Sequence, residues 1–237
     1  MIRMLEAASI KQFNPWDIYS ARVLSAWRTY EDGQFWQQND HQAALSLVDG
    51  FLHFSAKESA DFEELTAFLQ MLSWERLRCD SALAERLPFP LEQQGMTVRF
   101  IAPKKQGNPP IHLVKEIDEF FEIIKQGFPD IDQHAYAKDL ALRWQHGTAQ
   151  TWTLDGLCTA SAVDITEKFC FLGGVATLPQ ARGKGLAGKL LTEIASAHQR
   201  AGRDVYLSCK RELLPFYESV GFAAVNDYAI LCKEANK

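Results

Sequence analysis

The order of hydrophobic and polar positions predicts helices and strands that alternate along the chain. Apolar residues at helical spacing predict helices over residues 14–30, 59–72, 114–126, 132–145, 186–201 and 213–220. Short apolar runs predict strands over residues 45–48, 51–54, 96–101, 150–154, 157–165, 169–178, 205–209 and 223–232. Asn14 and Pro15 suit the cap and first turn of the first helix.

Two hairpins with the same turn chemistry stand in the two halves of the chain. Asp49-Gly50 and Asp155-Gly156 each separate two strand-like runs, and this dipeptide favours a tight hairpin turn. Phe35-Trp36 precedes the first hairpin much as Arg143-Trp144 precedes the second. Two explanations stay open: a tandem repeat with a degenerate N-terminal half, or chance similarity of two hairpin units.

A proline-rich segment over residues 102–110 divides the chain. It holds three prolines and a glycine and has no apolar periodicity, which is typical of a linker. We therefore expect an N-terminal domain over residues 1–101 and a C-terminal domain over residues 111–237. The chain of 237 residues is long enough for two small domains.

Composition and charge restrict the class of protein. Hydrophobic residues make up 47% and charged residues 23%, which is typical of a globular protein with a substantial core. The net charge of −5 argues against nucleic-acid binding. Five scattered cysteines without a CxxC pair predict reduced thiols. No signal peptide or apolar run of ~20 residues is present, so we expect a cytoplasmic protein without membrane contact.

The most informative segment is the glycine-rich stretch that follows the strand beginning at Phe169. The chain passes from the strand through Pro179 and residues 180–185 into an amphipathic helix. Several backbone N–H groups are then exposed at the positive end of a helix dipole, which binds phosphate or pyrophosphate. Gly183 and Gly185 allow a ligand to approach the backbone closely because they have no Cβ.

Two nucleotide-binding motifs match this stretch only in part. Residues 183–188 match the dinucleotide fingerprint, but residues 178–182 separate them from the strand, and the next strand leads into Lys210-Arg211 instead of an acidic ribose partner. Residues 183–189 also match a phosphate loop, but Leu190 cannot ligate magnesium where Ser or Thr is required. Both nucleotide interpretations therefore fail on chemistry.

A third motif fits. Gln180-x-x-Gly183-x-Gly185, after Val175-Ala176-Thr177-Leu178-Pro179, resembles the acyl-coenzyme A signature of the GNAT acetyltransferase superfamily. The later Phe216-Tyr217-Glu218-x-x-Gly221-Phe222 resembles the family's late helix. The resemblance covers residues 169–222. It implies an α/β (α+β) fold with a mixed, mostly antiparallel central sheet flanked by helices, over about residues 111–233.

The resemblance also implies a coenzyme site. Backbone groups near Val175 and Thr177, on a splayed strand, would bind the pantetheine arm, and N–H groups of the glycine bend would bind the pyrophosphate. The residues expected to bind the acyl-coenzyme A cosubstrate are Val175, Thr177, Gln180, Arg182, Gly183, Lys184, Gly185, Leu186 and Ala187. Many members carry an Asn near the position of Lys210, so a side-chain contact to pantetheine is not implied there. No metal is expected.

Catalytic residues are less clearly marked. Tyr217 matches the family's frequent general acid, and a phenol of pKa about 10 can protonate a leaving thiolate. Glu167, just before the Phe169 strand, is the expected general base. Other candidates for the base, each with a structural role as its alternative, are Asp164, His146 and His198. Cys209 has no histidine nearby in sequence, so we expect it to be a strand residue.

The sequence thus supports an N-acetyltransferase that moves an acetyl group from acetyl-coenzyme A to a primary amine by direct attack in a ternary complex. The acceptor could be a small molecule, an amino acid or a peptide, and the acidic balance favours a cationic amine. The alternative is a non-catalytic sensor of acyl-coenzyme A. Residues 1–101 are expected not to bind coenzyme A, because the segment after Phe54 lacks a glycine bend. Trp16, Trp27, Phe35 and Trp36 there would shape the acceptor side or fill a core.

Overall fold

The computed structural model describes residues 1–6, 10–39, 41–103 and 109–233. The chain forms two compact units, each with its own core. Unit 1 comprises residues 1–97 together with 226–237, and unit 2 comprises residues 98–225. The predicted linker at 102–110 falls inside unit 2, and its residues 104–108 lie outside the described residues.

Unit 1 is built on a mixed sheet with a single parallel pair among its first five strands. The strand order is β1 (Ile2–Met4), β2 (Gln34–Gln38), β3 (Ala43–Val48), β4 (Phe51–Ala56), β5 (Arg76–Asp80), followed by the unit's parts of β12 (Phe222–Cys232) and β6 (Leu91–Phe100). Strands β4 and β5 are parallel. The other neighbouring strands from β1 to β5 are antiparallel, and β12 pairs with β5 in the antiparallel sense as well. The predicted Asp49-Gly50 turn is confirmed, with both residues at positive φ.

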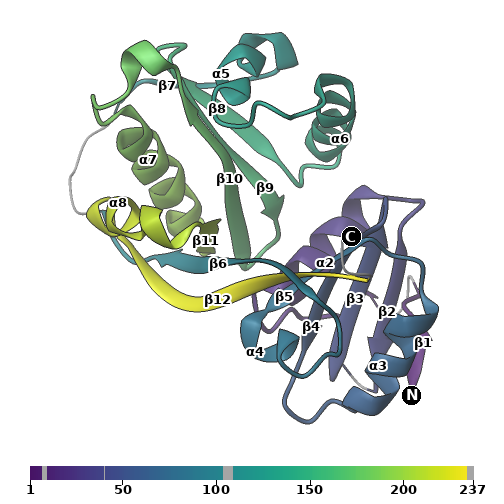
Figure 1. The fold of residues 1–237 in the computed structure, drawn as a ribbon. Helices are drawn as coiled ribbons and strands as arrows, with labels where there is room; N and C mark the ends of the chain where they lie inside the picture. Colours follow the sequence, from purple (N-terminus) through teal and green to yellow (C-terminus); the bar gives the residue numbers. More distant parts are fainter. Residues whose placement is uncertain (7–9, 40, 104–108, 234–237) are drawn as a thin grey trace. The chain divides into compact units, whose positions relative to one another are not determined.

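The helices given for the described part of unit 1 are α2 (Ile18–Thr29), α3 (Phe62–Met71) and α4 (Ser81–Ala84). Helices α2 and α3 lie on opposite faces of this sheet (Figure 1). Leu65 and Leu69 of α3 are fully buried in one core against β2 to β5, and Val23 and Leu24 of α2 belong to a second core. Three of the four predicted aromatic residues of the N-terminal half lie in or against the α2 core, namely Trp16, Trp27 and Phe35, and Trp36 lies in the α3 core. These rings therefore fill the cores of unit 1.

The first helix begins later than the sequence predicts. Its cap is Asp17, not Asn14. The Asp17 carboxylate accepts the backbone N–H of Ser20 at 2.7 Å, and the Ser20 hydroxyl accepts the backbone N–H of Asp17 at 3.0 Å. This reciprocal capping box satisfies two N–H groups at once, which a cap at Asn14 would not do.

Unit 2 has the same strand arrangement. Its order is β7 (Ile111–Leu113), β8 (Gln150–Leu154), β9 (Cys158–Ile165), β10 (Phe169–Thr177), β11 (Asp204–Cys209), followed by the unit's parts of β6 and β12. Only β10 and β11 form a parallel pair among the first five strands. The Asp155-Gly156 turn is confirmed by positive φ at both residues. The mixed, mostly antiparallel sheet flanked by helices confirms the predicted fold class.

The helices of unit 2 are α5 (Phe121–Lys125), α6 (Gln133–Gln145), α7 (Leu186–Arg200) and α8 (Leu214–Ser219), with short 3₁₀ turns η1 (Ile117–Glu119), η2 (Pro179–Ala181) and η3 (Arg211–Leu213). Helices α5 and α6 lie on one side of β9 and β10, and α7 lies on the other (Figure 1). The predicted helix over 114–126 is wrong as a continuous element. The Glu119 carboxylate accepts the N–H groups of Lys115 and Glu116, and Phe120 leaves helical geometry to enter the core.

Strands β6 and β12 each contribute to both units. Residues 91–97 of β6 and 226–232 of β12 belong to unit 1, whereas 98–100 and 222–225 belong to unit 2. The five residue pairs from Tyr228↔Asp80 to Cys232↔Arg76 attach the end of β12 to β5. The units therefore do not follow the chain order of the predicted domains, because the last strand of the predicted C-terminal domain completes unit 1.

Candidate functional site

The two parallel strands of unit 2 separate partway along their length. They pair from Phe169↔Asp204 to Leu172↔Leu207, after which β10 continues to Thr177 and β11 to Cys209. Among the described residues, no further pairs join these strands. The β10 backbone after Leu172 is therefore available on its β11 side for a ligand that pairs like a strand.

A bulge in β10 lies directly after this point of separation. Gly173 pairs with Ser161 and Ala176 with Thr159, so three steps along β10 match two along β9. The extra residue is accommodated at Gly174, whose φ of +59° is in the left-handed region. The bulge re-aims the backbone just before Val175, the residue that the resemblance places near the thioester.

The glycine bend begins α7 without a side-chain cap. Gly183 and Gly185 have φ of +75° and +73°, and Gly185 is the N-cap residue. The first turn of α7 contains no acidic residue, and a Cβ built on Gly183 or Gly185 would meet nothing within 4 Å. The N–H groups of Leu186, Ala187 and Gly188 precede the first bond of the helix, from the Lys189 N–H to the Gly185 carbonyl. This end of α7 is thus suited to an anion.

Side chains around the bend add positive charge. Lys184 and Lys189 are exposed. The Arg182 guanidinium instead holds the bend, because it donates to the carbonyl of Thr177 at 3.2 Å and to that of Gln126 at 3.1 Å. The Arg182 N–H is also engaged, with the Pro179 carbonyl at 3.3 Å. Arg182 therefore braces the site, and its contact at Gln126, the end of α5, has no signal in the sequence.

The other predicted coenzyme residues lie along one path from the bulge to α7. Val175 and Thr177 follow the bulge on β10, and the Thr177 hydroxyl donates to Cys158 Sγ at 3.2 Å. Gln180 is exposed in η2. Leu186 and Ala187 are half-buried in the first turn of α7. The structure brings these residues together with the glycine bend.

Tyr217 lies beside the end of β11. It is 7% exposed and packs edge-on against Phe216 and Phe222. Burial, together with the nearby Cys209, raises the pKa of Tyr217 to about 12. Burial also raises the pKa of the Cys209 thiol, with a further contribution from Glu212. Tyr217 is therefore a protonated phenol at neutral pH, as a general acid must be, and Cys209 is a protonated strand residue.

The expected general base does not share this site. Glu167 lies in the turn before β10, and Val175, near which the thioester is expected, lies six positions beyond Phe169, about 20 Å at ~3.3 Å per residue. The strand therefore separates Glu167 from the expected thioester position by most of its length. Asp164 is buried and forms an ion pair with Arg143 at 3.0 Å, which gives it a structural role.

The two candidate histidines also lie at helix ends. His146 is the exposed C-cap of α6. His198 is buried in the last turn of α7, edge-on to Trp152, and burial with the nearby Arg203 lowers its pKa to about 4. His198 is neutral at physiological pH, but almost the full length of α7 separates it from Gly185.

The corresponding segment of unit 1 is built differently. Strand β4 pairs with β3 in unbroken register from Val48↔Phe51 to Ala43↔Ala56, so it has no bulge. Helix α3 is capped by the Asp61 carboxylate, which accepts the Glu64 N–H at 3.0 Å. Glu63 and Glu64 occupy its first turn.

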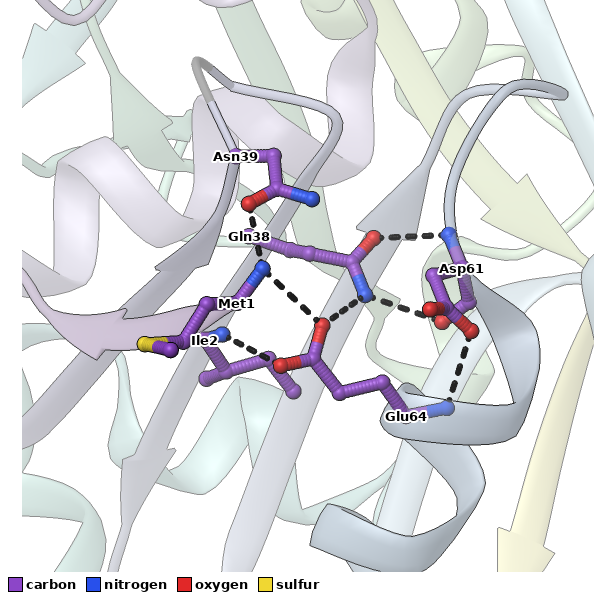
Figure 2. Close-up of polar contacts among 6 residues, drawn as sticks. All are labelled: Met1, Ile2, Gln38, Asn39, Asp61 and Glu64. Atoms are coloured by element: carbon purple, nitrogen blue, oxygen red, sulfur yellow. Dashed lines mark hydrogen bonds and ion pairs between the residues drawn. The ribbon is translucent and has the colours of Figure 1, made fainter.

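Figure 2 shows that the start of α3 is already occupied by polar partners. The Glu64 carboxylate accepts the Ile2 N–H and the Gln38 amide, each at 2.8 Å, and it forms an ion pair with the Met1 ammonium. Gln38 also bonds the backbone of Asp61 through both ends of its amide (Figure 2). This helix end therefore presents carboxylates where α7 presents free N–H groups.

In the part of the chain that the structure describes, every helix is too short or too polar to span a membrane. Within the same residues, no group of three or more His, Cys, Asp or Glu side chains is arranged to hold a metal ion.

Residues 147–224 match the family model described as an acetyltransferase (GNAT) domain. No curated protein matches the chain. Among solved structures, a GNAT-family acetyltransferase from Colwellia psychrerythraea has a TM-score of 0.59 at 12% identity and covers 99% of this chain and 100% of its own. A GCN5-related N-acetyltransferase from Kribbella flavida has a TM-score of 0.64 at 15% identity, with 92% and 95% covered.

A tandem GNAT protein from the clavulanic acid biosynthesis pathway has a TM-score of 0.56 at 11% identity, with 92% of this chain and 88% of its own covered. This likeness extends over both units and shows that unit 1 has a GNAT-like fold as well. The predicted resemblance is confirmed: residues 147–224 match a GNAT acetyltransferase domain, and the chain shares the fold of a tandem GNAT protein.

Proposed function

We propose that unit 2 binds acetyl-coenzyme A and transfers its acetyl group to a primary amine. The observation that carries the proposal is the uncapped start of α7, which follows two diverging strands and has two glycines at positive φ. N–H groups of the bend hold the pyrophosphate, with Lys184 and Lys189 nearby. The pantetheine arm runs along the free edge of β10 past Thr177 and Val175.

The reaction follows from this placement. An ammonium substrate first loses a proton to solvent, and the nitrogen lone pair of the resulting neutral amine attacks the thioester carbon. The N–C bond forms, and backbone donation near Val175 stabilises the oxyanion. The C–S bond then breaks, the coenzyme thiolate takes a proton from Tyr217, the nitrogen releases its second proton to solvent, and solvent returns a proton to the Tyr217 phenolate. Glu167 is not retained as the base because most of β10, about 20 Å at ~3.3 Å per residue, separates it from the thioester position near Val175. The acidic net charge favours a cationic amine.

A second candidate function is a sensor that uses the same coenzyme site but catalyses no reaction. Unit 2 could bind acyl-coenzyme A as a sensor without turning it over, because no carboxylate proposed from the sequence lies at the bend. The buried, protonated Tyr217 favours the enzyme.

The test is a coenzyme A release assay with acetyl-coenzyme A and a panel of amines: 2-phenylethylamine, spermidine, lysine and a dipeptide with a free amino group. The enzyme predicts release that depends on at least one amine. Binding is measured separately by thermal shift, where coenzyme at ~100 times its dissociation constant should stabilise the fold by about 2.7 kcal/mol. Binding without release supports the sensor. A response to NAD or ATP but none to coenzyme A would overturn both functions.

A further inference from the structure

Two successive residues of β10, Gly173 and Gly174, have no side chains where its bulge lies. A Cβ on Gly173 would lie 3.6 Å from Val163, and a Cβ on Gly174 would lie 3.5 Å from the Ser161 hydroxyl. Both positions therefore lie beside side chains of β9. This bare strip of backbone lies directly after Leu172, where β10 leaves β11.

Hydroxyl groups border the bare strip. The Tyr136 hydroxyl of α6 lies 3.7 Å from the Cβ position of Gly174, with Ile124 of α5 at 3.3 Å on the same side. Ser161 hydrogen-bonds the phenol of Tyr136, and its hydroxyl also shares a hydrogen bond of 2.8 Å with Thr151. Two hydroxyls, from Tyr136 of α6 and Ser161 of β9, thus lie beside Gly174, and Thr151 of β8 supports Ser161 from behind.

The chemistry of Tyr136 suits hydrogen bonding and not proton abstraction. Burial, with a smaller contribution from Asp139, raises the pKa of Tyr136 to about 12, although the hydrogen bond from Ser161 acts against this rise. The phenol therefore stays protonated at physiological pH. A neutral phenol can donate a hydrogen bond to a carbonyl.

The position along β10 identifies what the phenol would meet. Gly173 lies four positions before Thr177, which is next to the bend, a distance of about 13 Å at ~3.3 Å per residue. A coenzyme whose pyrophosphate occupies the bend and whose arm follows β10 brings its acyl end toward Gly173 and Gly174. We propose that Tyr136 is a substrate-positioning residue whose hydroxyl hydrogen-bonds the acyl thioester at the bulge, with Ser161 holding the phenol in place. This inference rests on the proposed function and adds to it a contact that distinguishes acyl-coenzyme A from free coenzyme A.

The test compares acetyl-coenzyme A with free coenzyme A by calorimetric titration of the full chain. Tyr136→Phe should weaken acetyl-coenzyme A binding about three- to tenfold, the range expected for one neutral hydrogen bond, and leave coenzyme A binding unchanged. Ser161→Ala should also weaken acetyl-coenzyme A binding relative to coenzyme A binding, by about twofold, because it loosens the phenol without removing it. Tyr228→Phe is the matched control: that phenol is buried in unit 1 and accepts a hydrogen bond from Gln93 at 2.8 Å.

The outcomes separate this inference from the function on which it rests. If the parent protein binds neither compound, the proposed function fails and the inference fails with it. If the parent binds both compounds, and Tyr136→Phe leaves the ratio of their dissociation constants unchanged, the inference fails and the proposed function stands. If Tyr136→Phe does not fold, Ser161→Ala decides, and an unchanged ratio in that variant overturns the inference. The inference is also overturned if Tyr228→Phe changes the ratio of the two dissociation constants as much as Tyr136→Phe does.

Discussion

Helices α3 and α7 begin after equivalent strands, yet their first turns have opposite chemistry. In unit 1, Asp61 caps α3 and two glutamates follow it. In unit 2, Gly185 begins α7 and no acidic residue follows. Both helix ends carry unsatisfied N–H groups and a positive dipole. The protein satisfies one end with its own carboxylates and leaves the other for an external anion.

The difference extends to the strand that precedes each helix. Strand β10 has a bulge at Gly174, and β4 has none. The parallel pair β4–β5 is also short, from Phe51↔Arg76 to His53↔Arg78, so unit 1 keeps the diverging strands without the features that would serve a ligand. The same fold thus carries the proposed ligand site in one unit and a helix start filled by the protein's own carboxylates in the other. Function lies in the local chemistry of the bend, and the fold alone does not confer it.

Removing the proposed acid tests whether unit 2 is catalytic. Tyr217→Phe should lower turnover about 10²–10⁴-fold if the phenol protonates the leaving thiolate, with only a small change in coenzyme affinity. A water that replaces the phenol would reduce the loss to about tenfold. Tyr19→Phe is the control, since Tyr19 is a buried phenol of unit 1 bonded to Thr97 at 3.2 Å. Turnover equal to that of the parent would assign Tyr217 to the core.

A cavity created by mutation in the core of unit 1 tests whether coenzyme binding by unit 2 depends on the stability of unit 1. Leu231, on β12, is 2% exposed in the α3 core, so Leu231→Ala should destabilise the protein by about 2–5 kcal/mol in urea unfolding. Coenzyme A affinity should not change. Val225→Ala, on the same strand but 50% exposed, should have little effect on stability. Loss of coenzyme affinity in the folded Leu231→Ala protein would contradict the independence of the site.

Acidification should act on unit 2 through His198. Its pKa is about 4 in the folded protein against an ordinary 6.5, so the unfolded chain binds more protons between these values. Stability is therefore complete above pH ~6.5 and falls as the pH drops toward 4, by up to about 3 kcal/mol from this group. His198→Gln should flatten the stability profile in this range, as measured by urea unfolding. An equal slope in the variant and the parent would exclude His198 as the cause.

Removing the carboxylate cap of α3 tests whether an empty helix end is enough for binding. Asp61→Ala should cost about 0.5–2 kcal/mol of stability, the usual range for a lost N-cap. It should not create a second coenzyme site, because Glu63 and Glu64 remain and β4 has no bulge. Coenzyme titration of this variant that gives two sites would show that the cap alone had excluded the ligand.

Local signals in the sequence predicted most of the site, and long-range contacts were missed. The two Asp-Gly turns and the glycine bend depend on residues a few positions apart, and they appear where predicted. The break at Phe120 depends on burial against distant residues, and the partition of β12 depends on pairing with β5 some 150 residues earlier. Likewise, the brace from Arg182 to Gln126 joins two segments that no periodicity connects. Glu167 precedes β10 by two residues, and the length of that strand alone separates it from the thioester position expected near Val175.

The stoichiometry of coenzyme binding tests the central claim most directly. Calorimetric titration of the full chain with acetyl-coenzyme A should give one site per chain. Gly185→Asp should abolish coenzyme binding, because it places a negative charge at the expected pyrophosphate position. Asn has the same size as Asp and a similar tolerance of the positive φ at this position, but it carries no charge. Gly185→Asn should therefore retain most of the binding. Asp61→Asn should leave the single site unchanged. Two sites in the parent, or equal affinity in the folded Gly185→Asp and Gly185→Asn proteins, would contradict the assignment of the site to the bend of unit 2.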